Sequence, residues 1–311
     1  MLILNQAIED YTAINITTRY PNWSAGLTYN FGDIAFSDHY YYKSLIDNNV
    51  GNAPENNALL WLRWDISNRY AQIDLQARTT TTCDVNTKDD ALAPFTLISE
   101  FQNDRYDAIA LGSVHASSIL IEIVNSGGTT VFSIYEELAD RRPEVVDWYT
   151  YYYTPLPGAA TSVPLENFFF RLDLYDLTHT IRVTLEEKSG SSSCSYMICG
   201  NSEYVGDTLY GVNMGLLDYS SKKIDDFGIL ELTRRESRQT MDIDITFASG
   251  RVNQVNRIVR NSLGKVVLFI NDENIDSQYE HLLLLGMVDD FTTVLSNSVE
   301  IQASINLSEV I

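Results

Sequence analysis

WSAGLTYNFGDIAFSDHYYYKSLIDNNVGNAPENNALLWLRW, residues 23–64, predicts one small β-unit. Gly32-Asp33 lies between two runs rich in tyrosine, phenylalanine and isoleucine, which is the dipeptide pattern of a tight hairpin turn. Residues 40–45 predict the second strand, and a polar loop over residues 47–54 follows it. Because a unit this small buries little surface, its aromatic side chains must form a small core or lie exposed as a platform.

We expect three of these aromatic residues, Tyr29, Tyr42 and Trp61, to form the core of the unit. A leader strand over residues 13–18 precedes it. Together they predict an N-terminal module over residues 1–67 whose hydrophobic contacts run mainly within itself.

The landmarks of this module are, in chain order, Trp23-Ser24-Ala25, Tyr29, Gly32-Asp33-Ile34, Tyr42-Lys43-Ser44, Asn48, Pro54 and Trp61. This order resembles that of the small chitin- and cellulose-binding modules. The resemblance implies exposed tryptophans after the second strand that stack on sugar rings, whereas Leu45-Ile46-Asp47 occupies that place here. We therefore expect a docking module. The alternative that the resemblance implies is a carbohydrate site formed by Trp23, Tyr41, Trp61 and Trp64.

Composition limits the partners of the chain. The 311 residues carry a formal net charge of −21, which argues against binding to a nucleic-acid backbone or an anionic membrane surface. No run approaches the roughly 20 apolar residues of a membrane span, and the N-terminal residues do not have the pattern of a signal peptide. Three cysteines, Cys83, Cys194 and Cys199, are too few for a disulfide framework. They predict small buried side chains in a protein made in a reducing cytoplasm.

The central region, residues 68–219, predicts many short strands. Residues 119–123 and 130–135 alternate in polarity and are joined by a turn at residues 125–128, which predicts a hairpin. Further strands are expected at residues 95–100, 108–111, 147–153, 168–173 and 180–186. Short strands separated by turns, with few helical stretches, predict an antiparallel β-sandwich of jelly-roll type.

The last region, residues 220–311, changes its period. Residues 241–247 alternate as a half-buried strand, and apolar residues then recur at helical spacing over residues 252–263, with Gly264 as the expected stop. Strands are expected at residues 266–270, 281–288 and 299–305. This order predicts a small α+β domain whose helix covers one face of a sheet, so the chain as a whole is expected to be mainly β.

A search for chemistry finds no catalytic or metal-binding pattern in the sequence. Nucleophile elbows, phosphate-binding glycine loops and zinc signatures are absent. Glu136-Glu137 and Glu186-Glu187 suggest a glycosidase pair, but adjacent residues on a strand point to opposite faces. We therefore expect no cofactor, no metal and no enzymatic activity. Hydrolysis of glycans is therefore the least favoured function for this chain.

Landmarks outside the first module also follow a recognisable order: Asn68-Arg69-Tyr70-Ala71, Tyr106-Asp107-Ala108-Ile109-Ala110-Leu111, Asp147-Trp148-Tyr149, Tyr210-Gly211, Asp218-Tyr219-Ser220-Ser221-Lys222, Asp226-Phe227-Gly228 and Arg234-Arg235-Glu236-Ser237-Arg238-Gln239-Thr240-Met241. With the first module, this order resembles a group of phage virion proteins. The resemblance implies a structural component of a tail, at its tip, baseplate or fibre attachment, assembled in the host cytoplasm.

That function implies other tail subunits as partners, including further copies of the chain. Arg234, Arg235 and Arg238 form the only basic cluster of an acidic chain, and arginine forks give oriented contacts to carboxylates. We expect these three residues at a subunit interface. The rival from another class is an adhesin that binds host-surface glycans.

Overall fold

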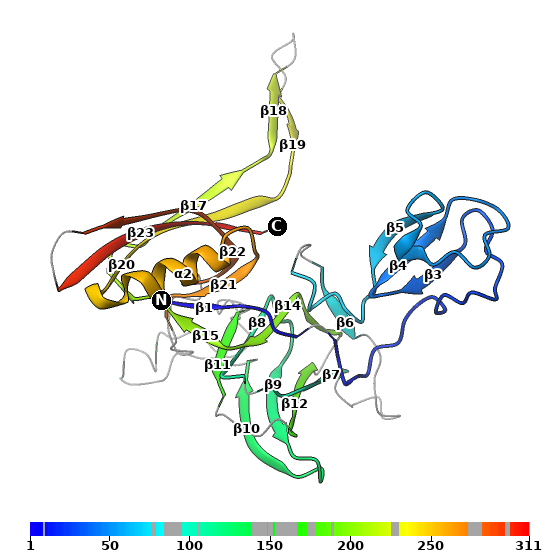
Figure 1. The fold of residues 1–311 in the computed structure, drawn as a ribbon, viewed down its shortest axis with the longest axis horizontal. Coiled ribbons are helices and arrows are strands. Elements are labelled where there is room, and N and C mark those ends of the chain that lie inside the picture. Colours follow the sequence, from blue (N-terminus) through cyan, green and yellow to red (C-terminus); the bar gives the residue numbers. More distant parts are fainter. Residues whose placement is uncertain are drawn as a thin grey trace.

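The computed structural model describes residues 1–8, 10–75, 79–83, 95–104, 106–138, 148, 152, 167–172, 178–187, 190–224, 230–272, 282–295 and 299–310. The protein is mainly β, as predicted, with several antiparallel sheets and a short C-terminal helix. A small module, a β-sandwich and an α+β domain lie side by side, and a two-stranded arm projects from the last of these (Figure 1).

The N-terminal module is a three-stranded antiparallel sheet in the order β3 (Ile34–Ser37), β4 (Tyr40–Ser44) and β5 (Trp61–Ile66). A 3-10 turn, η1 (Pro54–Asn56), precedes β5. The buried cluster of the module consists of Tyr29, Ala35, Tyr42 and Trp61. The three aromatic residues predicted as its core are therefore confirmed.

The hairpin turn of this module was predicted at the wrong residues. Asp38 and His39 connect β3 to β4, with φ of 44° and 72°. Two successive residues of positive φ are the mark of a type I′ turn, which matches the twist of the strands. Gly32 has a φ of 93° and lies in the turn that leads into β3, where its N–H donates to the carbonyl of Ser44.

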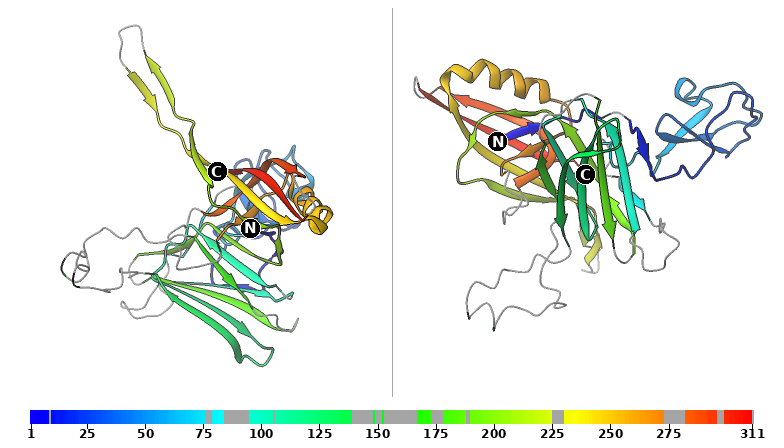
Figure 2. Two further views of the ribbon diagram at one scale, coloured as in Figure 1. Left: turned by 90° about the vertical axis from the view of Figure 1, so that its left-hand side faces the viewer. Right: turned by 90° about the horizontal axis from the view of Figure 1, so that it is seen from below.

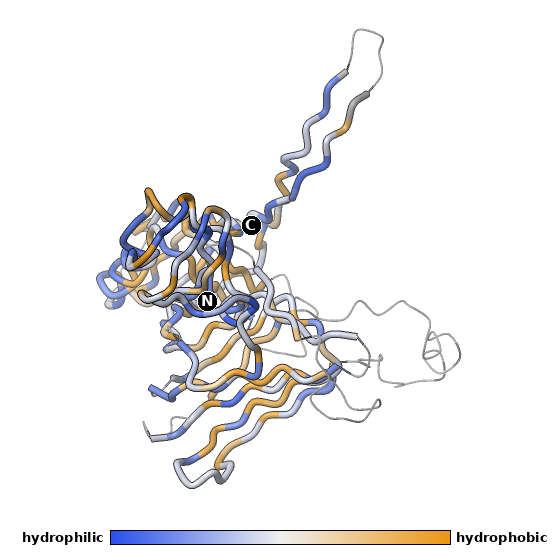
Figure 3. Tube along the Cα trace, turned by 90° about the vertical axis from the view of Figure 1, so that its right-hand side faces the viewer, coloured by the Kyte–Doolittle hydropathy of each residue, from blue (hydrophilic) through white to orange (hydrophobic). Residues whose placement is uncertain are grey.

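The sandwich contains a five-stranded sheet in the order β10-β9-β12-β7-β2. Its strands are β2 (Ala13–Ile14), β7 (Phe95–Gln102), β9 (Ser118–Val124), β10 (Thr130–Glu137) and β12 (Thr180–Glu187). The predicted hairpin is confirmed in β9 and β10, where the Asn125 side chain accepts hydrogen bonds from the N–H groups of Gly127 and Thr129. Apolar and polar residues alternate along these strands (Figure 3), which places one face of the sheet against the core.

Smaller sheets complete the sandwich. β11 (Phe168–Arg171), β8 (Ala108–Gly112) and β14 (Tyr196–Gly200) form one, and β13 (Ser192–Cys194) with β6 (Thr81–Cys83) forms the other. β8 and β14 are buried along their whole length because both of their faces are covered. One face contributes Ile109, Leu111 and Met197 to the sandwich core. The other contributes Ala108, Ala110 and Ile198 to a second cluster, against the C-terminal domain.

The C-terminal domain is built on an eight-stranded sheet. Seven strands follow the order β15-β1-β21-β22-β23-β20-β16, and β17 pairs with β20 outside that path. They are β1 (Leu2–Leu4), β15 (Ser202–Tyr204), β16 (Asp207–Thr208), β17 (Asn213–Asp218), β20 (Ser237–Ala248), β21 (Val267–Ile270), β22 (Leu283–Val294) and β23 (Glu300–Glu309). A 3-10 turn, η2 (Ser249–Arg251), leads into α2 (Val252–Ser262), whose buried residues pack on one face of the sheet. The predicted order of strand, helix and strand is confirmed, and Gly264 follows the helix with a φ of 72°.

The predicted module wrongly includes the first residues of the chain, and the predicted boundary at residue 219 differs from the sheet topology. The predicted end of the module at residue 67 agrees with the end of β5 at Ile66. β1 lies between β15 and β21 of the C-terminal sheet, and β2 pairs with β7 of the sandwich. The first residues therefore lie outside the module and are divided between the two other domains. The predicted leader strand over residues 13–18 is reduced to β2. β15, β16 and β17, which were expected in the sandwich, belong to the C-terminal sheet.

The leader between β1 and β2 also ties the domains together. The N–H of Ala7 donates to the carbonyl of Cys199, and the side chain of Gln6 bonds the backbone of both Met197 and Cys199. Gly200 is required here, because a Cβ at this position would lie 2.3 Å from the carbonyl oxygen of Asn5.

A strand was also predicted at residues 147–153, most of which lie outside the described residues. The two that are described, Trp148 and Tyr152, are helical. Their rings stack with centroids 5.9 Å apart, as residues four apart on a helix do.

Candidate assembly and glycan-binding surfaces

Two of the four predicted sugar-binding aromatic residues are buried. Trp61 is 2% exposed, its ring meets Tyr29 edge to face at 5.1 Å, and its indole N–H donates to the carbonyl of Asn52. Tyr41 is buried as well, and its hydroxyl accepts from the N–H of Arg19. Neither ring can stack on a sugar, so these two assignments are corrected: Trp61 belongs to the small core of the module, and Tyr41 packs between Tyr20 and Phe36.

The other two aromatic residues differ in their surroundings. Trp23 is half-buried against the module core. Trp64 is 52% exposed, and its ring lies 6.3 Å from that of Tyr20. It is the extra residue of a β-bulge, since Arg63 pairs with Tyr42 and Asp65 with Tyr41. Trp64 is thus the residue of this set that presents a ring to solvent.

The module is docked on the sandwich through Tyr70. Its ring stacks on His39 with centroids 3.9 Å apart and lies parallel to Phe36 at 6.1 Å. The hydroxyl of Tyr40 donates to the carboxylate of Asp74 over 3.0 Å. Burial, with the Asp74 carboxylate second, raises the pKa of Tyr40 and keeps this donor protonated. These contacts fix the module to the sandwich, and its docking role stays a prediction.

The predicted arginine cluster is split by the structure. Arg238 is half-buried, where its guanidinium donates to the carbonyl of Glu309 (Nε to O, 2.6 Å) and to the hydroxyl of Ser308. Arg234 and Arg235 are exposed, and neither forms an ion pair with any residue that the structure describes. Arg238 therefore holds the edge of its own sheet, and the two other arginines remain available for a partner.

These two arginines lie on the projecting arm, which we define as residues 213–240. β17 pairs with the first half of β20 in the lower part of the arm, and β18 (Ser221–Ile224) pairs with β19 (Leu230–Thr233) farther out. Figure 2 shows the arm extending well beyond the body of the molecule. Of its described residues, 213–219, 222, 223 and 232–237 are exposed.

The arm carries an unusual number of exposed apolar side chains, which the sequence did not single out. They are Met214, Leu216, Leu217, Tyr219 and Leu232, and Leu216 is 76% exposed. Large apolar side chains grouped on a projecting element mark an interaction surface more often than isolated ones do. The signal was present in the sequence as the apolar run Met214-Gly215-Leu216-Leu217.

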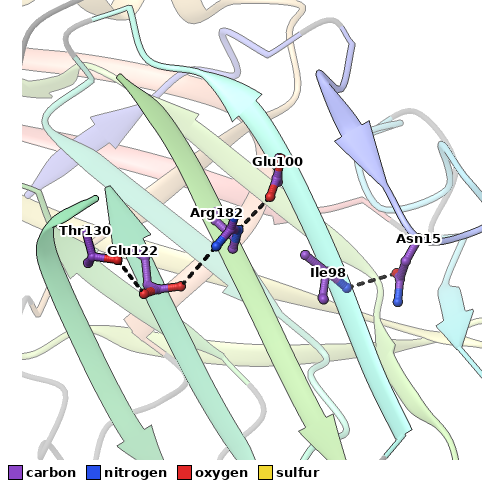
Figure 4. A network of polar contacts seen from close by, with 6 residues as sticks. All are labelled: Asn15, Ile98, Glu100, Glu122, Thr130 and Arg182. Carbon is purple, nitrogen blue, oxygen red and sulfur yellow. Dashed lines mark hydrogen bonds and ion pairs between the residues drawn. The ribbon is translucent and has the colours of Figure 1, made fainter. Parts of the chain in front are cut away.

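The outer face of the five-stranded sheet is polar and closed by a charge network (Figure 4). Arg182 on β12 contacts Glu100 on β7 over 2.5 Å and Glu122 on β9 over 3.7 Å, and Thr130 donates to the Glu122 carboxylate. The network spans four neighbouring strands. Every side chain of the network has a partner on the sheet, so the network stabilises a solvent-exposed face and does not indicate a binding site.

We also searched the described residues for metal-ligand clusters, reactive cysteines and membrane-spanning helices. The structure brings no group of three or more histidine, cysteine, aspartate or glutamate side chains together among the described residues. The three cysteines are free and buried, as predicted, and burial raises the pKa of Cys194 to about 12. No helix in the described ranges is long and apolar enough to cross a membrane.

Comparison with known proteins adds no identification, because no family model matches the chain and no curated protein is similar to it in sequence. The function must be argued from the surfaces described above.

Proposed function

We propose that this protein is a non-enzymatic structural subunit of a phage tail, assembled into the particle through protein–protein contacts. The observation that carries the proposal is the projecting arm with its exposed apolar and basic side chains. An element of this kind has no use in an isolated monomer, where it exposes apolar surface at a cost in solubility. It suits a protein whose neighbours are present in fixed positions.

The order of sequence landmarks supports the same proposal, since it resembles that of phage virion proteins with a chitin-binding-like module. The build of the molecule is compatible with it. β1 and the leader clamp the sandwich to the C-terminal domain, which gives a stiff body from which an arm can reach a neighbour. Such a subunit would act at the tail tip, the baseplate or a fibre attachment.

Incorporation into particles tests the proposal. Virions purified from cells that carry the gene are analysed by mass spectrometry and by labelling with an antibody against the N-terminal module. We expect the chain in stoichiometric amounts at one end of the tail, and cells lacking the gene should yield defective tails. Complete tails without the chain would refute the proposal.

An adhesin that binds host-surface glycans is the second candidate, and it rests on Trp64. This ring is exposed and lies beside that of Tyr20. Aromatic faces of this kind stack on sugars through apolar ring contacts. Binding of the isolated protein to a glycan array, lost in Trp64→Ala and retained in Leu59→Ala, would favour this function, since Leu59 is also exposed on the module.

A further inference from the structure

The C-terminal sheet has one face that is only half covered. α2 packs on the opposite face. On this face the sandwich covers Leu2, Leu4, Leu268 and Ile270, which lie on β1 and β21. Farther along the same face, on β20, β22 and β23, the residues are polar and open. We call this uncovered part the open face.

The open face is acidic. Its register places Asp242 and Asp290 on either side of Asn306, because both are paired with that residue. Asp244 and Glu300 lie on the same face, and all four carboxylates belong to exposed residues. Because neighbouring strands are about 4.8 Å apart, the carboxylates of Asp242, Asp244 and Asp290 form one patch of negative charge, and Glu300 lies farther along β23.

The arm differs from the rest of the chain in charge. Residues 213–240 contain five basic and five acidic residues, so the entire formal charge of −21 lies outside the arm. The described basic side chains that are exposed on it are Lys222, Lys223, Arg234 and Arg235. Lys222 pairs with Asp218 at 3.7 Å, and the others form no ion pair with the described residues. The arm thus offers positive charge beside its exposed apolar residues.

Arg238 shows within one chain how an arm arginine fits the open face. It lies at the root of the arm, donates to Ser308 and to the carbonyl of Glu309, and Ser308 in turn donates to Asp289 over 2.8 Å. Arg234 and Arg235 lack such acceptors because the arm carries them away from the sheet (Figure 2). The open face of another copy exposes carboxylate acceptors for them, those of Asp242 and Asp290.

From this charge complementarity we propose that the arm of one copy binds the open face of the C-terminal sheet of the next. Arg234 and Arg235 would meet Asp242 and Asp290, and apolar residues of the arm such as Leu216 and Leu232 would be covered by the neighbour. A chain at −21 repels its own copies, so self-association requires a local match of charge of this kind. This inference rests on the proposed function, assembly by protein–protein contacts.

The proposed contact is heterologous, because the arm of one copy meets a different surface of the other. Contacts of this type close into a ring when the rotation between copies permits it and otherwise continue as a filament. A rotation of 180° closes two copies into a dimer that exchanges its arms, and other rotations give larger rings or filaments.

The test measures the mass distribution of the full-length protein by sedimentation velocity over a range of concentrations up to about 1 mM, which covers weak specific association. We expect concentration-dependent oligomers. The dissociation constant of the R234E/R235E oligomer should be at least about tenfold higher than that of the wild type, since like charges would then face each other. The matched control is R257E/R260E on the exposed side of α2, which changes the net charge by the same amount. It should behave nearly as the wild type.

A charge exchange makes the test specific. In R234E/R235E/D242R/D290R the two surfaces are again complementary, and association should return to near the wild-type level. Circular dichroism melting curves establish that each variant is folded. Three results would overturn the inference: a wild type that stays monomeric, equal effects of R234E/R235E and R257E/R260E, or no recovery in the exchange variant.

Failure here is distinguishable from failure of the proposed function. A chain that enters particles but shows any of these three results still has its structural role, with a different protein on the arm. A chain that associates through the arm but is absent from particles assembles into something other than a phage tail.

Discussion

Replacement of Trp61 by alanine should unfold the N-terminal module while the sandwich stays folded. Trp61 is the largest member of a cluster of four buried residues, and that cluster is separate from the sandwich core. Truncation of a buried tryptophan costs about 3–5 kcal/mol. The loss of the bond from its indole N–H to the carbonyl of Asn52 adds about 1 kcal/mol. A unit of about 45 residues has only about 2–7 kcal/mol of stability in total.

The assay is hydrogen exchange followed by mass spectrometry, which reports the module and the sandwich separately in one sample. In Trp61→Ala, peptides from β3, β4 and β5 should lose protection while those from β7 and β12 keep it. The control is Trp64→Ala on the same strand, which removes an exposed ring and should change stability by less than about 0.5 kcal/mol. Retained protection in Trp61→Ala, or loss of protection in the sandwich as well, would refute the separate core.

Three further predictions concern other parts of the chain. Ile3→Asp places a charge in the middle of the C-terminal sheet and should cost more than about 4 kcal/mol in urea unfolding, whereas Ile3→Val should cost about 1 kcal/mol. Arg182→Met should cost about 1 kcal/mol, because its bridges to Glu100 and Glu122 are partly exposed, and the difference should shrink at about 1 M salt. Cys194 has a pKa raised by burial from 9.0 to about 12, so its contribution to stability is complete below pH 9.0 and is lost as the pH rises toward 12. The urea midpoint should therefore fall more steeply over that range in the wild type than in Cys194→Ala.

Elements with a clear period were predictable from the sequence. β9 and β10 alternate in polarity and are joined by a turn whose Asn125 can accept the turn N–H groups, so local chemistry and pattern agree. The α2 segment repeats its apolar residues at helical spacing and ends before Gly264. These elements were predicted because the information that determines them lies within a few residues.

The incorrect predictions of the hairpin turn and of the first strand have physical causes. The hairpin turn of the module uses Asp38 and His39 at positive φ in place of glycine, and these residue types adopt that conformation only occasionally. β1 is three residues long and pairs with strands about 200 and 265 positions away, which no local pattern can reveal.

One miss among the site residues was avoidable. Trp61 was expected both in the module core and in the sugar site, and one ring cannot serve both; it lies in the core. Trp64 is the extra residue of a β-bulge, so its direction does not follow from its spacing to Trp61. Tyr41 and Tyr42 are adjacent on β4 and point to opposite faces: the second fills the module core, and the first packs between Tyr20 and Phe36 at the side facing the sandwich.

The run Met214-Gly215-Leu216-Leu217 is the clearest disagreement between local sequence and structure. Continuous apolar runs elsewhere in the chain, such as those of β1, β8 and β21, are buried on both faces because a layer covers each side. β17 has a similar run, and all six of its residues are exposed. In most of a folded chain, the local sequence pattern agrees with the burial that the fold provides. β17 has the pattern of a buried strand but is exposed. Such disagreements occur mainly at functional sites. No element in the described part of the chain covers this strand, and the neutral charge of the arm against a body at −21 favours the acidic open face of another copy as its covering layer.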